Sequence, residues 1–276
     1  MLIVTDALVI RSSEYGENDR LLTLLSPEHG RMQVIAKGAR KMVSKQMQCA
    51  QLFCYANYEL YEKRGMYWLR SGNIQSSFYR LSENLEAMAL AHYLCDVAGD
   101  LCGEEVGAES LLRLLLNCLY VLSEKDIPPS LVKAVFEFRS MAMSGFYPYS
   151  VDQCSICQKK MTGNADPQAV MYWDVSDGRM SCPACMARRP SEPESPEEIR
   201  YASRVFTLTP GAAAAYRYTM TAPTARMFSF QMHDEKDIQL FGEMAEAYLL
   251  EHLERSFDTL AFYKQITAPP DAVKKD

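Results

Sequence analysis

The sequence lacks the motifs of the common nucleotide-dependent and hydrolytic enzymes. None of the patterns G-x-x-x-x-G-K-[ST], G-x-G-x-x-G, H-E-x-x-H and G-x-S-x-G occurs in its 276 residues, and its four histidines are scattered. No apolar run approaches the 18 residues of a membrane span, and no signal peptide pattern is present. We therefore expect a cytoplasmic protein that is not an enzyme, has no contact with membranes, and would need another protein for any ATP-dependent step.

Acidic residues are absent from His29 to Asn57, although the formal net charge of the chain is -6. Residues 1–80 hold 11 Lys or Arg and 7 Asp or Glu, a balance of +4, whereas the remaining 196 residues hold 18 and 28, a balance of -10. This asymmetry predicts a cationic surface near the start of an acidic chain, and an anionic partner for it. The cations of the acid-free segment are Arg31, Lys37, Arg40, Lys41 and Lys45.

The first 80 residues have the pattern of a small β-structure. Runs at 5–12, 20–26 and 31–37 are joined by segments rich in Gly, Pro, Asn and Asp, which favour tight turns. Two aromatic-rich runs, 53–61 and 66–71, flank a predicted hairpin turn at 62–65. Five short strands predict a closed or nearly closed barrel, either an OB-fold or an SH3-like barrel.

The stretch ALVIRSSEYGENDRLLTLLSPEHGRMQVIAKGARK, which ends at Lys41, closely resembles the N-terminus of the RecO family of bacterial recombination mediators. The resemblance is specific over residues 5–41, holds by pattern over 42–80, reappears near residues 154–185, and is weak beyond about residue 190. It implies an OB-fold and a nucleoid-associated protein that binds single- and double-stranded DNA and anneals strands. It also implies loading of the recombinase RecA together with RecR, and binding of the C-terminal tail of single-stranded-DNA-binding protein.

With this resemblance, the five cations of the acid-free segment become candidate DNA-binding residues. If all five contact phosphates, binding to single strands should show a log-log salt slope of roughly -3 to -4. The alternative is an ordinary solvated loop. Five aromatic side chains could stack on bases, although alternate members should fill the barrel core: Tyr55, Tyr58, Tyr61, Tyr67 and Trp68.

Two C-x-x-C pairs, Cys154/Cys157 and Cys182/Cys185, are separated by 24 residues. Four thiolates in two pairs are typical of a tetrahedral zinc site, and such a site leaves no open position for a catalytic water, so the zinc would be structural. A redox centre and two disulfides are the alternatives. The spacer, with Trp173 and Gly178, also resembles the cysteine module of many RecO-like proteins. Some family members lack these cysteines, which implies that zinc supports the architecture and not the activity. The other five cysteines should be buried.

The rest of the chain is predicted to be helical. Residues 81–99 show a stripe at spacings of three and four (Leu81, Leu85, Met88, His92, Cys95, Gly99), 108–123 are apolar nearly all round, and further helices are expected at 131–144, from Ser195, and at 235–255. We therefore predict an α+β protein. Its parts are an OB-fold at 1–80, a helical domain at 81–150 and 190–266 with an inserted zinc module at 151–189, and a disordered tail at 267–276. Arg113, Lys133 and Arg139 are either solvated helix charges or contacts for the partner tail.

Two other functional classes stay open. A zinc-ribbon scaffold that binds only proteins would show no salt-dependent affinity for DNA. A thiol-disulfide enzyme would need a cysteine of lowered pKa. The hypothesis that we favour is a recombination mediator that binds DNA through the barrel.

Overall fold

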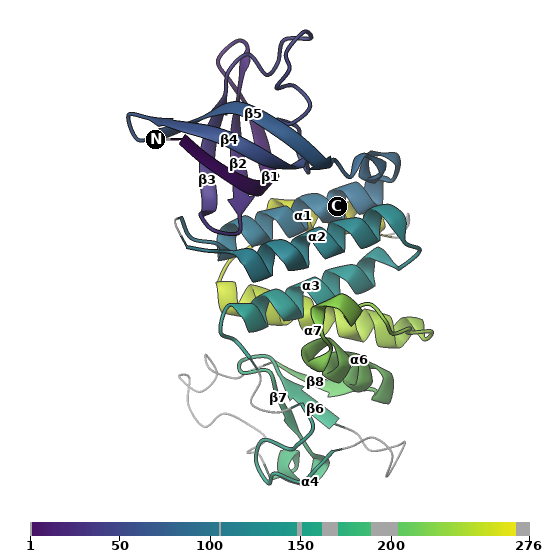
Figure 1. Ribbon diagram of the computed structural model, residues 1–276. Helices are drawn as coiled ribbons and strands as arrows, with labels where there is room; N and C mark the ends of the chain where they lie inside the picture. The colour runs from purple at the N-terminus through teal and green to yellow at the C-terminus, as the bar shows by residue number, and fades with distance from the viewer. Residues whose placement is uncertain (1, 105, 148–150, 162–170, 189–203, 269–276) are drawn as a thin grey trace, which may run out of the picture. The chain divides into compact units, whose positions relative to one another are not determined.

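The computed structural model describes residues 2–104, 106–147, 151–161, 171–188 and 204–268 (Figure 1). The chain forms two compact units. The first comprises Met1–Pro129 with Phe257–Asp276, and the second comprises Ser130–Ser256. Among the described residues, no helix combines the length and the apolar character needed to cross a bilayer.

The first unit begins with a closed five-stranded barrel, as the sequence predicted. Its strands pair in the order β1-β2-β3-β5-β4, antiparallel except for β3 with β5. The predicted hairpin is confirmed: Lys63 pairs with Met66, and Arg64 and Gly65 both have positive φ (56° and 74°), as a two-residue type I′ turn requires. The strands are β1 (Leu2–Tyr15), β2 (Asp19–Ser26), β3 (Gly30–Ala36), β4 (Tyr55–Lys63) and β5 (Met66–Ser76).

Helices α1 (Leu85–Leu101), α2 (Glu109–Glu124) and α8 (Asp258–Thr267), with the 3-10 turn η1 (Tyr79–Glu83), complete this unit. The side chain of Asn84 accepts a hydrogen bond from the amide of Ala87, which caps the start of α1.

The face that α1 buries differs from the predicted stripe. Cys95 is buried, but Leu85 is 63% exposed, and Met88 and His92 are half-buried beside Phe262 in a groove of about 340 Å³. The residues that α1 buries combine small and large side chains and share only Cys95 with the predicted stripe: Ala87, Ala89, Leu90, Ala91, Tyr93, Leu94, Cys95, Val97 and Ala98.

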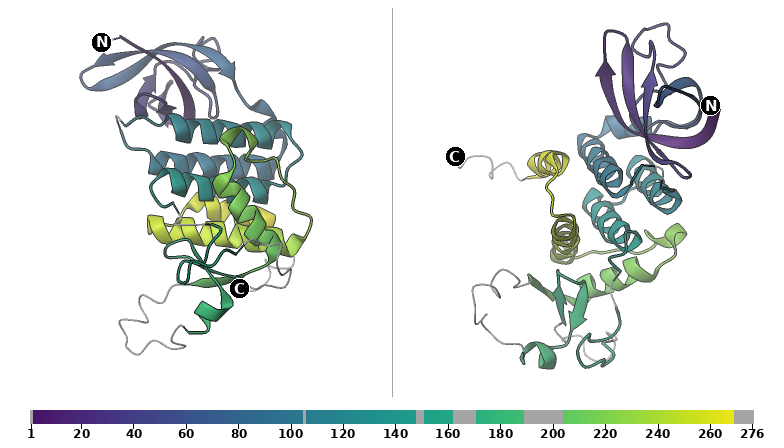
Figure 2. Two further views of the ribbon diagram at one scale, coloured as in Figure 1. Left: turned by 60° about the horizontal axis from the view of Figure 1, so that its bottom comes forward. Right: turned by 90° about the vertical axis from the view of Figure 1, so that its left-hand side faces the viewer.

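The second unit combines helices with a small sheet. Its helices are α3 (Pro129–Met143), α4 (Pro183–Met186), α6 (Pro210–Thr221) and α7 (Glu235–Leu253), with the 3-10 turn η2 (Thr224–Arg226). Strands β6 (Met171–Asp174), β7 (Arg179–Ser181) and β8 (Val205–Leu208) form an antiparallel sheet in the order β7-β6-β8, and α4 lies beside this sheet (Figure 2).

Aromatic rings join this sheet to the helices. Trp173 of β6 is fully buried, and its ring packs edge-on against Phe138 of α3, Tyr216 of α6 and Tyr248 of α7, with centroids 5.4–5.8 Å apart. The predicted helix at 235–255 is confirmed as α7, which buries Phe241, Ala245 and Tyr248. Elements β8, α6 and α8 were not predicted. The start of the helix predicted from Ser195 and residues 269–276 of the predicted tail lie outside the described residues.

Gly30 is the tightest point between the barrel and the segment that links α1 to α2. It has φ +63°, and a Cβ there would lie 2.6 Å from the carbonyl oxygen of Gly103 and closer still to that of Val106. The amide of Arg31 donates to the Gly103 carbonyl at 3.2 Å, and the amide of Ala108 donates to that of Pro27 at 2.9 Å. Backbone therefore packs directly on backbone here, which only glycine permits.

We predict that Gly30→Ala destabilises the protein far more than Gly16→Ala. Both positions have positive φ, so each alanine costs about 1–2 kcal/mol. Only at Gly30 does the methyl group meet backbone atoms, since nothing lies within 4 Å of a Cβ at Gly16; this should cost a further ~1–3 kcal/mol. Urea denaturation measures the difference, and equal losses at the two sites would contradict the tight packing.

Candidate functional site

The acid-free segment comprises β3, the start of β4, and between them residues 37–54, which we call the β3–β4 connection. The connection leaves the end of β3 that is remote from α1 and α2 (Figure 1). Part of it belongs to the barrel core: Ala39, Cys49, Ala50 and Cys54 are buried there, and the hydroxyl of Tyr58 donates to the Cys49 carbonyl at 2.7 Å. The connection is therefore a structured part of the barrel.

Two side chains anchor this connection to different hairpins. Arg40 forms a 2.9 Å ion pair with Glu14 and donates to the carbonyls of Gly16 and Glu17, at the β1–β2 turn. Gln46 donates through Nε2 to the carbonyls of Leu69 and Arg70 on β5, at 3.0 and 3.2 Å. The residues between these anchors are held outside the barrel.

Three of the five predicted DNA-binding cations lie free on this connection. Lys37, Lys41 and Lys45 are exposed, and within the described part of the chain none of them forms an ion pair. Arg40 lies beside them, but its guanidinium is already engaged. The structure thus brings four of the five cations together.

Arg31 lies apart from the other four. It stands at the start of β3, and six residues of strand place it about 20 Å from Lys37. Its guanidinium donates to the Gly99 carbonyl at 2.8 Å and lies 3.9 Å from a carboxylate oxygen of Glu104. These contacts hold the barrel against the end of α1, which gives Arg31 a structural task that the sequence did not reveal.

The aromatic residues divide between the core and the surface, as expected for alternating strand positions. Tyr58 is fully buried, and burial holds its pKa well above the ordinary value. Tyr67 packs against the core cluster. Tyr61, which is 37% exposed, and Trp68 pair across β4 and β5 with rings nearly parallel, 15° apart at 6.3 Å. Trp68 directly precedes Leu69, whose carbonyl anchors Gln46, so this pair lies beside the β3–β4 connection.

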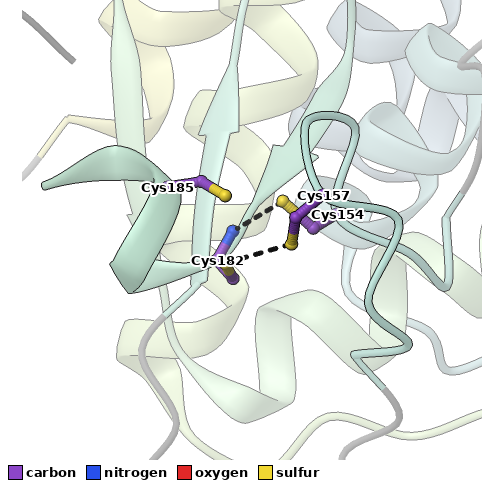
Figure 3. A group of neighbouring side chains, drawn as sticks. All are labelled: Cys154, Cys157, Cys182 and Cys185. Atoms are coloured by element: carbon purple, nitrogen blue, oxygen red, sulfur yellow. Dashed lines mark hydrogen bonds between the residues drawn. The ribbon is translucent and has the colours of Figure 1, made fainter. Parts of the chain in front are cut away.

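The four cysteines converge on one point in the second unit (Figure 3). All four sulfur atoms lie within 4.8 Å of one another, and those of Cys157 and Cys182 are 3.8 Å apart. Metal–sulfur bonds of about 2.3 Å in a tetrahedron place sulfurs about 3.8 Å apart, so the cluster can hold one metal ion. All nine cysteines lie within described residues, and all are free thiols, which disfavours the disulfide alternative.

Local backbone structure positions the sulfur atoms of each cysteine pair. The amide of Cys182 donates to the sulfur of Cys154 at 3.4 Å, and Cys185 stands in α4, one turn after Cys182. Burial raises the pKa of Cys154, but backbone hydrogen bonds near Cys157 and Cys182 outweigh it and lower this pKa to about 6. A hydrogen bond with Cys157 raises the pKa of Cys185 to about 12. Four thiolates side by side repel one another, and a divalent cation relieves that repulsion.

Distant residues support the cysteine module. Arg217 of α6 donates to the carbonyls of Val151 and Met161, at 3.1 and 2.7 Å, and so closes the loop that carries Cys154 and Cys157. The hydroxyl of Tyr216 donates to the Gly178 carbonyl at 3.0 Å, at the turn before the second cysteine pair. The sequence offered no signal for either residue.

The three helical cations considered for a partner tail behave differently from one another. Arg113 is exposed and pairs with Glu109 at 2.9 Å. Lys133 is buried with its ammonium 2.8 Å from Glu137 and 2.9 Å from Glu246, so it is neither solvated nor free for a ligand. Burial lowers the pKa of Lys133, but these two carboxylates outweigh it and raise the pKa. Arg139 donates to the carbonyls of Thr219 and Ala222.

We predict that Arg31→Gln destabilises the protein by about 1–3 kcal/mol, because the part-buried carbonyl of Gly99 loses its donor. Lys37→Gln removes the same charge from an exposed, unpaired side chain and should change stability by less than about 0.5 kcal/mol. Urea denaturation of both variants tests this. Equal stabilities would contradict the structural role of Arg31.

Two family descriptions match this chain, "Recombination protein O N terminal" over residues 1–78 and "Recombination protein O C terminal" over residues 82–261. The chain is 29% identical over 262 residues to a DNA repair protein RecO of Acetivibrio thermocellus. The aligned region covers 95% of this chain and 96% of that protein. It is 35% identical over 187 residues to that of Desulfitobacterium hafniense, covering 66% of this chain and 64% of that protein. With the closed barrel, the helices and the cysteine cluster, these matches show that the chain belongs to the RecO family of DNA repair proteins.

Proposed function

We propose that this protein is a non-enzymatic recombination mediator that binds single- and double-stranded DNA through the β3–β4 connection and promotes strand annealing. With RecR, it would load RecA onto DNA covered by single-stranded-DNA-binding protein. The observation that supports DNA binding most directly is the group of three exposed, unpaired lysines, Lys37, Lys41 and Lys45, on the end of a barrel remote from α1 and α2. Such a surface neutralises phosphates without reading sequence.

The same surface fits annealing chemically. Two complementary strands repel each other through their phosphates, and cations that engage one backbone reduce that repulsion. The Tyr61–Trp68 pair offers a flat aromatic surface next to the lysines, on which a base can stack. We therefore include these two side chains in the proposed interface and leave out Arg31, whose guanidinium is occupied at the other end of β3.

We propose zinc as the metal of the cysteine cluster, because four thiolates in a tetrahedral arrangement are its usual structural ligands. Cys154, Cys157, Cys182 and Cys185 would hold the ion, and four sulfur ligands leave no open position for substrate. Its role would be to stabilise the loop and the β6–β7 hairpin that carry these cysteines, separately from DNA binding by the barrel.

Partners and location follow from the family as proposals. A tail of single-stranded-DNA-binding protein that is acidic and hydrophobic needs an apolar groove, and Leu85, Met88 and Phe262 line one between α1 and α8. Lys133 and Arg139 are unsuitable as its cationic contacts, since both are engaged internally.

A cytoplasmic, nucleoid-associated location would accompany DNA binding. The alternative of a zinc-ribbon scaffold that binds only proteins is distinguished by the next experiment.

We predict that Lys37→Ala/Lys41→Ala/Lys45→Ala lowers the salt dependence of DNA binding. Three lost phosphate contacts should reduce the log-log slope on a single strand by about 2. Fluorescence anisotropy of a labelled oligonucleotide at several salt concentrations measures the slope.

The matched control is Lys125→Ala/Lys236→Ala/Lys264→Ala, which removes the same total charge from exposed positions directly after α2 and within α7 and α8. It should keep the wild-type slope. Equal slopes in all three proteins would place DNA elsewhere, and no affinity for DNA would favour the protein-binding scaffold.

We predict one zinc ion per chain in the purified protein. Cys182→Ser should lose it, whereas Ser155→Ala, in the same module but without a ligand atom, should keep it. Because metal binding contributes on the order of 10 kcal/mol to folding such modules, metal loss should expose the segment around residues 151–188 to proteolysis. Mass spectrometry of metals and limited digestion provide the readout; a metal content unchanged by Cys182→Ser would contradict the assignment.

A further inference from the structure

The β3–β4 connection carries two apolar side chains at its apex. Met42 and Val43 are each 92% exposed, more than any other large apolar residue in the described part of the chain. The amide of Ser44 donates to the Lys41 carbonyl at 2.9 Å, which makes Met42 and Val43 the two central residues of a tight turn. Such turns favour Gly, Asn, Asp and Pro at these positions, so the turn itself gives no reason for Met and Val.

The apex is held in position by hydrogen bonds on both sides. Before it, the amide of Lys41 donates to the Gly38 carbonyl, and Arg40 binds the β1–β2 turn. After it, the amide and side chain of Gln46 bind Ser44 and β5 respectively. A fixed turn that exposes two apolar side chains loses little conformational entropy when it inserts into a ligand.

The surroundings of the apex favour a nucleic acid as that ligand. Lys41 directly precedes Met42, and Lys45 follows Val43 after Ser44. Lys37 lies on the same connection, and within the described part of the chain all three lysines are exposed and unpaired. An apolar tip with free cations beside it matches a ligand in which apolar groups lie next to negative charge. A single strand has this arrangement, since its stacked bases run alongside one phosphate chain.

We propose that Met42 and Val43 act as a wedge, which inserts between neighbouring bases of the bound single strand while the lysines hold its phosphates. This inference rests on the proposed DNA binding and adds a function to it, the unstacking of bases. Apolar side chains of other DNA-binding proteins insert between base steps of duplex DNA and partly unstack them. Strands held with unstacked bases expose their pairing edges, which fits a protein that brings complementary strands together.

An oligonucleotide with 2-aminopurine inside an adenine run tests the wedge, because this base brightens when it is unstacked. The wild type should raise its fluorescence at saturation. Met42→Ser/Val43→Ser should abolish most of that rise and weaken binding about tenfold, the effect expected for one lost base contact, with the salt slope unchanged because no lysine is altered. Both residues are 92% exposed, so the substitutions leave no cavity.

The control is Val4→Ser/Ile74→Ser, which replaces two other exposed apolar residues of the same barrel, 54% exposed on β1 and 38% exposed on β5. It should behave as the wild type. An equal fluorescence rise in the Met42/Val43 variant would overturn the wedge, as would salt-dependent binding by the wild type without any rise. If the wild type showed neither a fluorescence rise nor salt-dependent binding, the proposed DNA binding itself would be overturned.

Discussion

The barrel closes through a short parallel pairing, Val34 with Tyr67 and Ile35 with Trp68, and the candidate interface depends on that closure. Because β5 lies between β3 and β4, the chain cannot turn directly from β3 into β4 and has to pass the end of the barrel. In doing so it buries Ala39, Cys49, Ala50 and Cys54 as part of the core. The polar and cationic residues between Ala39 and Cys49 do not enter the barrel core. Lys41 and Lys45 are therefore exposed to solvent because the closed barrel leaves no space for them inside.

In the second unit, packing around one buried aromatic side chain limits where the cysteine-bearing hairpin can lie. Trp173 sits in β6, and its ring is enclosed by Phe138, Tyr216 and Tyr248 from three helices. The next turn of the hairpin passes so close to Tyr248 that a Cβ on Gly178 would lie 3.1 Å from its hydroxyl oxygen. These contacts hold the β6–β7 hairpin, which leads to the second cysteine pair, against the helices. A metal ion bound by the cysteines would hold the same pair through its sulfur atoms. The aromatic core therefore gives the cysteine-bearing hairpin a defined position against the helices of its unit.

Features carried by local patterns were predictable from the sequence. Alternating strand residues, the Arg64-Gly65 turn and the two C-x-x-C pairs each depend on neighbours only a few positions away, and the structure contains all of them. Arg31 was assigned by charge alone, and its partner carbonyl at Gly99 lies 68 residues further along the chain. For α1, the predicted stripe shares only Cys95 with the residues that the helix buries, because the face that packs inward is set by elements distant in the sequence. The support from Arg217 and Tyr216 also comes from distant segments and could not be inferred.

The return of α8 to the first unit has a consequence for biosynthesis. Thr259 donates to Asp96 at 2.9 Å, and the ring of Phe257 packs edge-on against Tyr93, so α1 depends on a helix that is translated more than 150 residues later. The ribosome delivers the barrel first, yet the unit that contains it stays incomplete until the intervening second unit has emerged. During that interval the surface of α1 that later receives α8 is open to chaperones. Completion of the unit that contains the barrel therefore has to wait for synthesis of the second unit.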